Sequence, residues 1–331
     1  PVARHQLTLD GAVDHVTRVR KNATGKPVSY VYARYLVPFF GKQTKMSTIT
    51  AVDVERYKEH RLAAGAANAT VNRELEALRR AFTLAERDKL IASRPYISRL
   101  KEDNVRKGFF ERHEFEAICR HLPRQRKKPL TADQIADDPV VGFCTFGYLT
   151  GWRHGEVKGL RWKNVDFKAG TVRLDVGTTK NKEGRTIYMT TALRALLERR
   201  LQLVKRHTPR TKVVQFREGK DNGDGLVFCR KNGRAIGSFQ TAWWSACRAA
   251  KIADRIERRE LPDGTVIEKR HPGRLFHDFR RSAARDFTRA GIPQHVAMQL
   301  LGHKTPAIFR RYAIVADEDL KTAAEKLNQR Q

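Results

Sequence analysis

The hydrophobic residues of the first ninety positions recur at helical spacing, without the alternation of a half-buried β-strand. One apolar stripe consists of Val71, Leu75, Leu78 and Phe82. A second stripe lies within 29–40. Thr50, with Asp53 three residues later, has the spacing of a capping box that opens a further helix. These features predict that residues 1–94 fold as a small bundle of short helices.

A polar, charged stretch at 95–108 separates this bundle from the rest of the chain and is predicted to be an interdomain linker. Within 109–331, the segments 171–176 and 185–189 have β-strand character, whereas most of the remainder has helical periodicity. Two stretches are predicted to be loops or insertions: 208–224 and 253–273. The sequence therefore predicts a mainly α fold with a small antiparallel β-sheet, in which a helical domain precedes an α+β domain. A short helix over 318–331 is expected to form the tail.

The charge balance of the chain points to a polyanionic partner. Lysine and arginine number 66 and aspartate and glutamate 36 in 331 residues, so the formal net charge is +30. Such a surplus attracts nucleic acid. The sequence has no apolar run long enough to span a bilayer, and its four cysteines are scattered without a CxxC pair. These observations predict a cytoplasmic, nucleoid-associated protein that binds double-stranded DNA and no membrane.

Several sites that depend on a metal or a nucleotide are excluded by spacing. The chain has no GxxxxGK[ST] phosphate-binding loop. His113-Glu114 begins like a zinc-protease helix, but position 117, where the second zinc ligand would stand, is alanine. The run 221–225 resembles a calcium loop only in composition, because Asn232 replaces the bidentate glutamate. No carboxylate cluster suits two-metal nuclease chemistry. If the protein acts on DNA, it is expected to use neither a metal nor another cofactor.

Cleavage of a phosphodiester without a metal requires cationic donors for the non-bridging oxygens, a nucleophile and an acid for the leaving oxygen. The chain offers these groups in short, separated stretches. Arg153 and Glu156 lie in one of them, and Lys180 lies at the turn between the two strand-like segments. The others contain His277 and Arg280, then His303, then Tyr312.

These stretches resemble the motifs of the tyrosine recombinases, also called phage-type integrases. TGWRHGEVKGLRWKNVD is similar to the segment that bears the first catalytic arginine of the family, and HDFRRSAA is similar to its His-x-x-Arg box. LLGHKTPAIFRRY resembles its LGH box with the nucleophilic tyrosine at the expected distance. The helical N-terminal part is similar, in pattern only, to the SAM-like core-binding domain. The resemblance covers nearly the whole chain.

The resemblance implies a catalytic role for each of these residues. Tyr312 attacks the scissile phosphate and forms a 3′-phosphotyrosyl bond, so strand exchange needs no ATP. Arg153 and Arg280 bind the non-bridging oxygens, for which the planar guanidinium is suited. His303 adds a further donor. His277 assists proton removal from the nucleophile, since a free phenol has a pKa of about 10.

The remaining two roles concern the leaving group and the support of the first arginine. Lys180 would protonate the leaving 5′-oxygen, and Glu156 would orient Arg153 or the neighbouring histidine. TTKNKEGR offers both Lys180 and Lys182 for the acid role. The distance of eight residues to Tyr188, which stands where many members have proline, favours Lys180.

The resemblance implies integration or excision of a phage or other mobile element. The protein would bind inverted half-sites as a homodimer and assemble a homotetrameric synapse, to which accessory DNA-bending proteins could be added. The tail at 318–331 would pack on a neighbouring protomer. Candidate phosphate contacts in the N-terminal domain are Lys45, Arg73 and Arg79. Two alternatives stay open: a type IB topoisomerase-like enzyme, and a DNA-binding protein that keeps the fold without the reaction.

Overall fold

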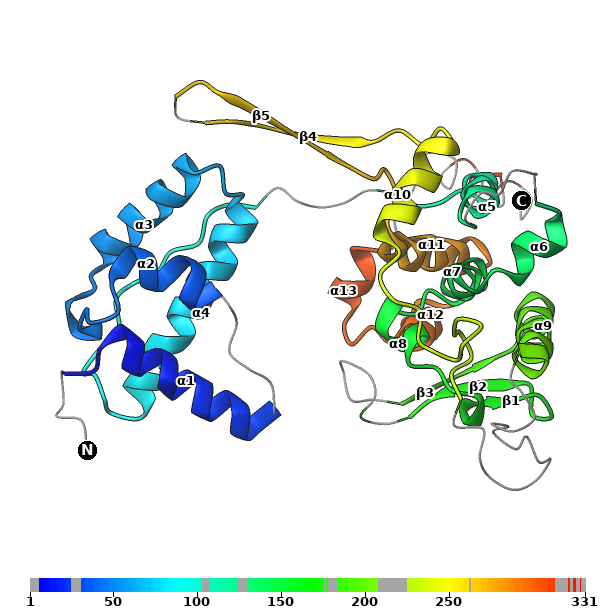
Figure 1. Ribbon diagram of the computed structural model, residues 1–331, viewed down its shortest axis with the longest axis horizontal. Helices are drawn as coiled ribbons and strands as arrows, with labels where there is room; N and C mark the ends of the chain where they lie inside the picture. The colour runs from blue at the N-terminus through cyan, green and yellow to red at the C-terminus, as the bar shows by residue number, and fades with distance from the viewer. Residues whose placement is uncertain are drawn as a thin grey trace. The chain divides into compact units, whose positions relative to one another are not determined.

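The computed structural model of the chain consists of two compact units (Figure 1). One comprises residues 1–106 with 257–269, and the other comprises residues 107–256 with 270–331. The structure describes residues 6–24, 31–102, 108–123, 130–175, 177, 184–207, 225–261, 263–312, 321, 324, 325 and 328. Among these residues no helix is long and apolar enough to cross a membrane.

The first unit is built from short helices, as the periodicity predicts. Its α-helices are α1 (Leu9–Thr24), α2 (Val37–Phe40), α3 (Ala51–Ala63) and α4 (Asn68–Arg87), with a π-helical turn η1 (Tyr32–Leu36) and a 3₁₀ turn η2 (Met46–Thr48). The capping box at the start of α3 is confirmed, because Thr50 Oγ1 accepts from the Asp53 amide and the Asp53 carboxylate accepts from the Thr50 amide. The four residues of the predicted stripe on α4 are all buried in the core of this unit.

A buried polar network joins α3 to α4. Glu74 is 1% exposed and accepts hydrogen bonds from the Tyr57 hydroxyl and from Nε and Nη2 of Arg61. The three bonds offset the cost of removing the carboxylate from water. The network therefore specifies how these two helices pair.

Part of the predicted linker packs against this unit. Ile97 is buried and Leu100 contacts the same core, so residues 97–100 continue the N-terminal unit beyond the predicted boundary at 94. The Asn72 side chain accepts from the Leu100 amide at 2.9 Å and donates to the Leu100 carbonyl at 2.8 Å. The Asn72 side chain thus pairs with the backbone of Leu100 as a neighbouring β-strand would. The periodicity of the sequence does not predict this pairing.

The second unit combines helices with a small sheet. Its α-helices are α5 (Arg112–His121), α6 (Ala132–Asp137), α7 (Pro139–Thr150), α8 (His154–Lys158), α9 (Thr191–His207), α10 (Gln240–Ala249), α11 (Phe279–Arg289), α12 (Gln294–Leu301) and α13 (Pro306–Arg310). Two 3₁₀ turns are η3 (Trp162–Asn164) and η5 (Phe276–Asp278). The strands β1 (Val165–Asp166), β2 (Thr171–Leu174) and β3 (Arg185–Tyr188) form an antiparallel sheet in that order. The predicted fold class, mainly α with a small antiparallel sheet, is confirmed.

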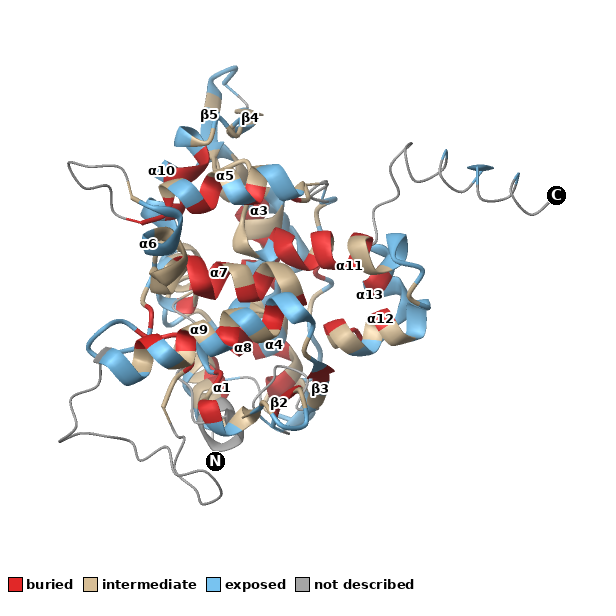
Figure 2. Cartoon of the chain, turned by 90° about the vertical axis from the view of Figure 1, so that its right-hand side faces the viewer, coloured by how far each residue is buried: buried red, intermediate tan, exposed pale blue. Residues whose placement is uncertain are grey.

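Helix α7 lies at the centre of this unit, between α11 and α9 (Figure 1). Figure 2 shows that it is buried or partly buried along its length. Its apolar sequence therefore needs no polar face, unlike that of a surface helix. Glycine at 147 allows close approach of η5 and of the first residue of α11, because a Cβ there would lie 2.5 Å from the Phe276 ring and 3.2 Å from the Phe279 ring. The site described below is built at the C-terminal end of α7.

The segment 253–273 is a hairpin of two strands, β4 (Arg255–Glu260) and β5 (Val266–His271), which pair only with each other and are largely exposed (Figure 2). Gly264, between the two strands, has a positive φ of 80°. Other predictions fall outside the described residues: Lys180, Lys182, the insertion at 208–224 and most of the tail at 318–331.

Candidate active site

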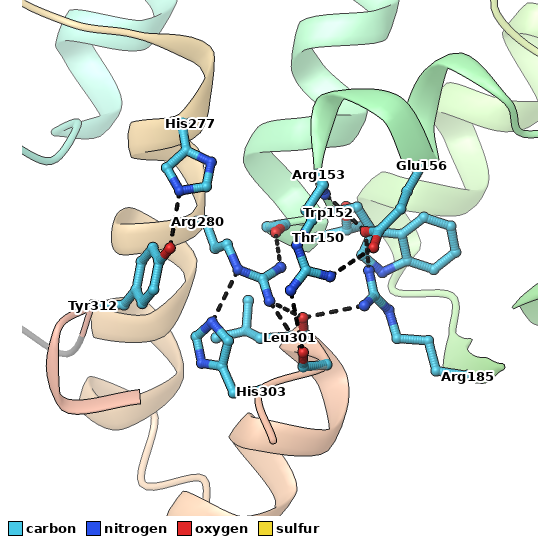
Figure 3. Close-up of polar contacts among 12 residues, drawn as sticks. Thr150, Trp152, Arg153, Glu156, Arg185, His277, Arg280, Leu301, His303 and Tyr312 are labelled. Atoms are coloured by element: carbon cyan, nitrogen blue, oxygen red, sulfur yellow. Dashed lines mark hydrogen bonds and ion pairs between the residues drawn. The ribbon is translucent and has the colours of Figure 1, made fainter. Parts of the chain in front are cut away.

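The turn after α7 presents Arg153. Gly151 ends the helix in the left-handed region with φ 64°, and a Cβ there would lie 2.5 Å from Leu301 Cδ2, so both backbone conformation and packing require glycine. Arg153 is then the N-cap of α8. Its amide donates to Glu156 Oε2 at 2.8 Å and its Nη1 donates to Oε1 at 2.9 Å. Glu156 thus accepts from both the backbone amide and the guanidinium of Arg153 (Figure 3).

Arg280 lies on the buried face of α11 and is only 2% exposed. Its Nη1 donates to the Gly151 carbonyl at 3.0 Å, its Nη2 donates to the Leu301 carbonyl, and its Nε donates to His303 Nε2 at 2.9 Å. The guanidinium therefore ties the end of α7 to the end of α12. By contrast, the side chain of Arg153 is 26% exposed, which makes it the more accessible of the two predicted phosphate ligands.

His303 follows the C-terminal end of α12. Gly302 has φ 65° and ends the helix in the left-handed region, and the His303 amide donates to the Met298 carbonyl at 2.8 Å. Because Nε2 accepts from Arg280, a neutral His303 ring carries its proton on Nδ1. Nδ1 is buried and has no hydrogen-bond partner within the described parts of the chain. Burial and the positive charges of Arg280 and Arg153 lower the pKa of His303 to about 3.

Tyr312 and His277 point toward each other (Figure 3). Tyr312 comes two residues after α13, and its hydroxyl lies 2.9 Å from Nε2 of His277 on η5. The Tyr312 ring also stacks on the His303 ring, with centroids 4.7 Å apart. Burial and the charge of Arg280 lower the pKa of His277, which favours the neutral imidazole at pH 7. A neutral His277 can accept the hydroxyl proton of Tyr312.

The structure adds Arg185, a site residue that the sequence motifs do not indicate. It is the first residue of β3, and its side chain is 7% exposed. Its Nη2 pairs with Glu156 Oε2 and its Nη1 donates to the Leu301 carbonyl at 3.1 Å. The signal available in the sequence was alternation: Arg185 and the buried Ile187 lie on the same face of the strand.

The positive charge of the site is concentrated on three neighbouring guanidinium groups, those of Arg153, Arg185 and Arg280. Burial and the other two arginines lower the pKa of Arg280 to about 9, so it remains charged at neutral pH. Two arginines, in turn, outweigh the effect of burial on Glu156, and the pKa of that carboxyl is lowered. Within the described residues no group of three His, Cys, Asp or Glu side chains could hold a metal ion.

The three residues of the first unit that are predicted to contact phosphates differ in how exposed their side chains are. Lys45 and Arg73 are exposed. Arg79 is engaged within the protein, because its Nη1 donates to Glu76 and its Nη2 donates to the Ile97 carbonyl at 2.6 Å. Arg79 therefore supports the packing of residues 97–100 in the structure.

The sequence profile of the phage integrase family matches residues 109–319. The ICEBs1 integrase of Bacillus subtilis (strain 168) is 24% identical to this chain, with 61% of the chain and 57% of that protein aligned. The chain thus aligns with little more than half the length of this relative.

Solved structures of two integrases have the same fold. A lambda integrase dimer bound to a COC′ core site gives a TM-score of 0.63 at 15% identity, covering 93% of this chain and 95% of that one. A lambda integrase tetramer bound to a Holliday junction gives 0.60 at 16% identity, covering 93% and 78%. The Tn1549 transposon integrase in complex with a circular intermediate DNA gives 0.64 at 15% identity, covering 97% and 99%.

Proposed function

This chain belongs to the phage integrase family, the tyrosine recombinases, and we propose that it cleaves and rejoins DNA at specific sites to integrate or excise a mobile element. The observation that carries the proposal is the convergence of five side chains in one unit. The Tyr312 hydroxyl lies 2.9 Å from His277, and the His303 ring stacks on the tyrosine while accepting a hydrogen bond from Arg280. Arg153 is held beside them by Glu156.

In the proposed reaction, Tyr312 Oη attacks the scissile phosphorus and its proton passes to Nε2 of His277. The bond to the 5′-oxygen breaks as the 3′-phosphotyrosyl bond forms, so the number of phosphoester bonds is unchanged and no nucleotide hydrolysis is required. The neutral state of His277, favoured by its lowered pKa, supports its role as proton acceptor.

The transition state carries negative charge on the non-bridging oxygens, and fixed cationic donors stabilise it without reorganisation. Arg153 is the more accessible donor, and Arg280 adds a buried positive charge. His303 is proposed as a further donor; in the structure its Nε2 accepts from Arg280, so the N–H of the neutral ring lies on the buried Nδ1. Lys180 is proposed to protonate the leaving 5′-oxygen, with Lys182 as the alternative.

The test is a suicide substrate, in which a nick beside the cleavage position lets the 5′-hydroxyl fragment diffuse away. The protein is incubated with this DNA in EDTA, and a denaturing gel is scored for a covalent adduct. Wild-type protein should accumulate the adduct, and Tyr312→Phe should bind the DNA equally well and form none. Binding without an adduct in the wild-type protein would contradict the proposal. Relaxation of supercoiled plasmid by the monomer would favour the topoisomerase alternative.

We also propose that the chain acts on DNA as a homodimer on each pair of half-sites and as a homotetramer in the synapse. The lambda integrase dimer and tetramer, which share the fold, support this assembly. In the first unit, Lys45 and Arg73 are proposed to contact phosphates. Replacing either one should weaken binding to all sequences and reduce the salt dependence of binding by about one ion.

A further inference from the structure

Arg185 has a buried charge that the proposed reaction does not use. Its side chain is 7% exposed, and its guanidinium lies 4.9 Å from the centre of the Trp152 ring. A buried cation is costly unless it is fully paired, and a hydrophobic residue of similar volume often serves stability as well. The position of Arg185 therefore calls for an explanation other than packing.

The partners of Arg185 are the same groups that hold the predicted phosphate ligands. Glu156 binds the guanidinium of Arg153 through Oε1 and that of Arg185 through Oε2 (Figure 3). The Leu301 carbonyl accepts from both Arg185 and Arg280. Both hydrogen-bonded groups, Glu156 and the Leu301 carbonyl, thus bind Arg185 and also one of the two predicted phosphate ligands.

The carbonyls of Leu301 and Gly302 form the C-terminal end of α12, where the helix dipole places partial negative charge. Three guanidinium groups converge on this end. Arg153 and Arg280 both lie 3.5 Å from the Gly302 carbonyl, and Arg185 lies 3.1 Å from that of Leu301. His303, the next residue, depends on the same turn for its position.

Both the backbone conformation at position 302 and the neighbouring side chain of Arg185 require glycine there. Besides its φ of 65°, a Cβ at this position would collide with Nη1 of Arg185. The arginine therefore occupies the space that a side chain at 302 would fill. The turn and the strand residue constrain each other directly.

We propose that Arg185 is a positioning residue, which holds Glu156 and the turn at Leu301–Gly302 so that Arg153 and His303 keep their geometry toward the scissile phosphate. This inference rests on the proposed function. Arg185 touches neither DNA nor the nucleophile in this scheme, and its effect is transmitted through the two groups that it binds.

The test compares two DNA substrates in single-turnover cleavage with saturating protein. One has a normal scissile phosphate, and in the other a methylphosphonate removes the negative charge of one non-bridging oxygen. Arg185→Met should slow cleavage of the phosphate by about 10- to 100-fold, the loss expected from a displaced catalytic group. It should slow cleavage of the methylphosphonate by no more than about threefold, because less charge then needs to be offset.

Arg200→Met is the matched control. Arg200 is 3% exposed and donates to the carbonyls of Asp137 and Cys229, so its replacement also removes a buried guanidinium bound to backbone. This variant should give the same ratio of rates on the two substrates as the wild-type protein. An unchanged ratio in Arg185→Met, or an equal shift in both variants, would overturn the positioning role.

Amide hydrogen exchange tests the same inference without catalysis. Arg185→Met should speed exchange of the amides of Gly302 and His303, which donate to the carbonyls of Gln299 and Met298. Arg200→Met should leave them unchanged. If the wild-type protein forms no covalent adduct, the proposed function fails, whereas unchanged exchange at these two amides in Arg185→Met removes the positioning role itself.

Discussion

Acidification should lower the free energy of unfolding of the second unit, because His303 is buried there with a lowered pKa. The ring is 7% exposed and its pKa is lowered to about 3 by burial and the surrounding arginines, compared with about 6.5 for histidine in an unfolded chain. Below pH 6.5 the unfolded state binds a proton that the folded state does not. The free energy of unfolding therefore falls as the pH falls below 6.5, and this loss continues until the pH reaches about 3.

The size of the effect follows from the two pKa values. Between pH 7 and pH 5 the difference in proton binding at His303 lowers the free energy of unfolding by about 2 kcal/mol. His277, whose pKa is also lowered, adds to the slope in the same direction. The contribution of His303 is therefore isolated by comparing the wild-type protein with His303→Gln, whose amide oxygen can still accept from Arg280.

Urea unfolding followed by tryptophan fluorescence provides the assay. All four tryptophans of the chain lie between residues 152 and 244, so their emission reports on the second unit. The wild-type protein should lose about 2 kcal/mol more than His303→Gln on going from pH 7 to pH 5. Equal losses in the two proteins would refute the reasoning, because they would mean that folding does not perturb the protonation of His303.

Three further predictions concern residues that stabilise the packing within one unit or the other. Glu156→Ala should cost about 3–5 kcal/mol in the same urea assay, because it leaves Arg185 buried without its carboxylate; a loss below about 1 kcal/mol would argue against the pairing. Gly302→Ala should cost at least about 1 kcal/mol for its left-handed backbone and should slow suicide-substrate cleavage. Asn72→Ala should expose residues 97–100 to limited proteolysis, and an unchanged cleavage pattern would contradict their anchoring by Asn72.

Local signals account for much of the fold that the sequence predicts. The capping box at Thr50 and the apolar stripe of α4 depend on residues three or four positions apart, and both are present in the structure. The strand-like segments at 171–176 and 185–189 contain the paired strands β2 and β3. Pro306 begins a helix and Gly302 ends one, as their backbone preferences require.

The C-terminal boundary of the first unit could not be predicted from local sequence signals. Residues 97–100 contain two apolar side chains in a polar stretch, which is too short a pattern to distinguish a linker from a packed segment. Their anchoring depends on Asn72, 28 residues away from Leu100 along the chain. Pairings over such distances leave no periodic signal.

The sequence alone supplied the candidate chemical groups: its resemblance to the motifs of the tyrosine recombinases implied Arg153, His277, Arg280, His303 and Tyr312, and the structure brings all five together. Only the tertiary structure decided how they are supported. Arg185 acquires its two partners because β3, α8 and the end of α12 meet, at separations of 29 and 116 residues. The sequence does not show whether an arginine is solvated or buried. Its burial and its partners depend on contacts between segments that are distant in the sequence.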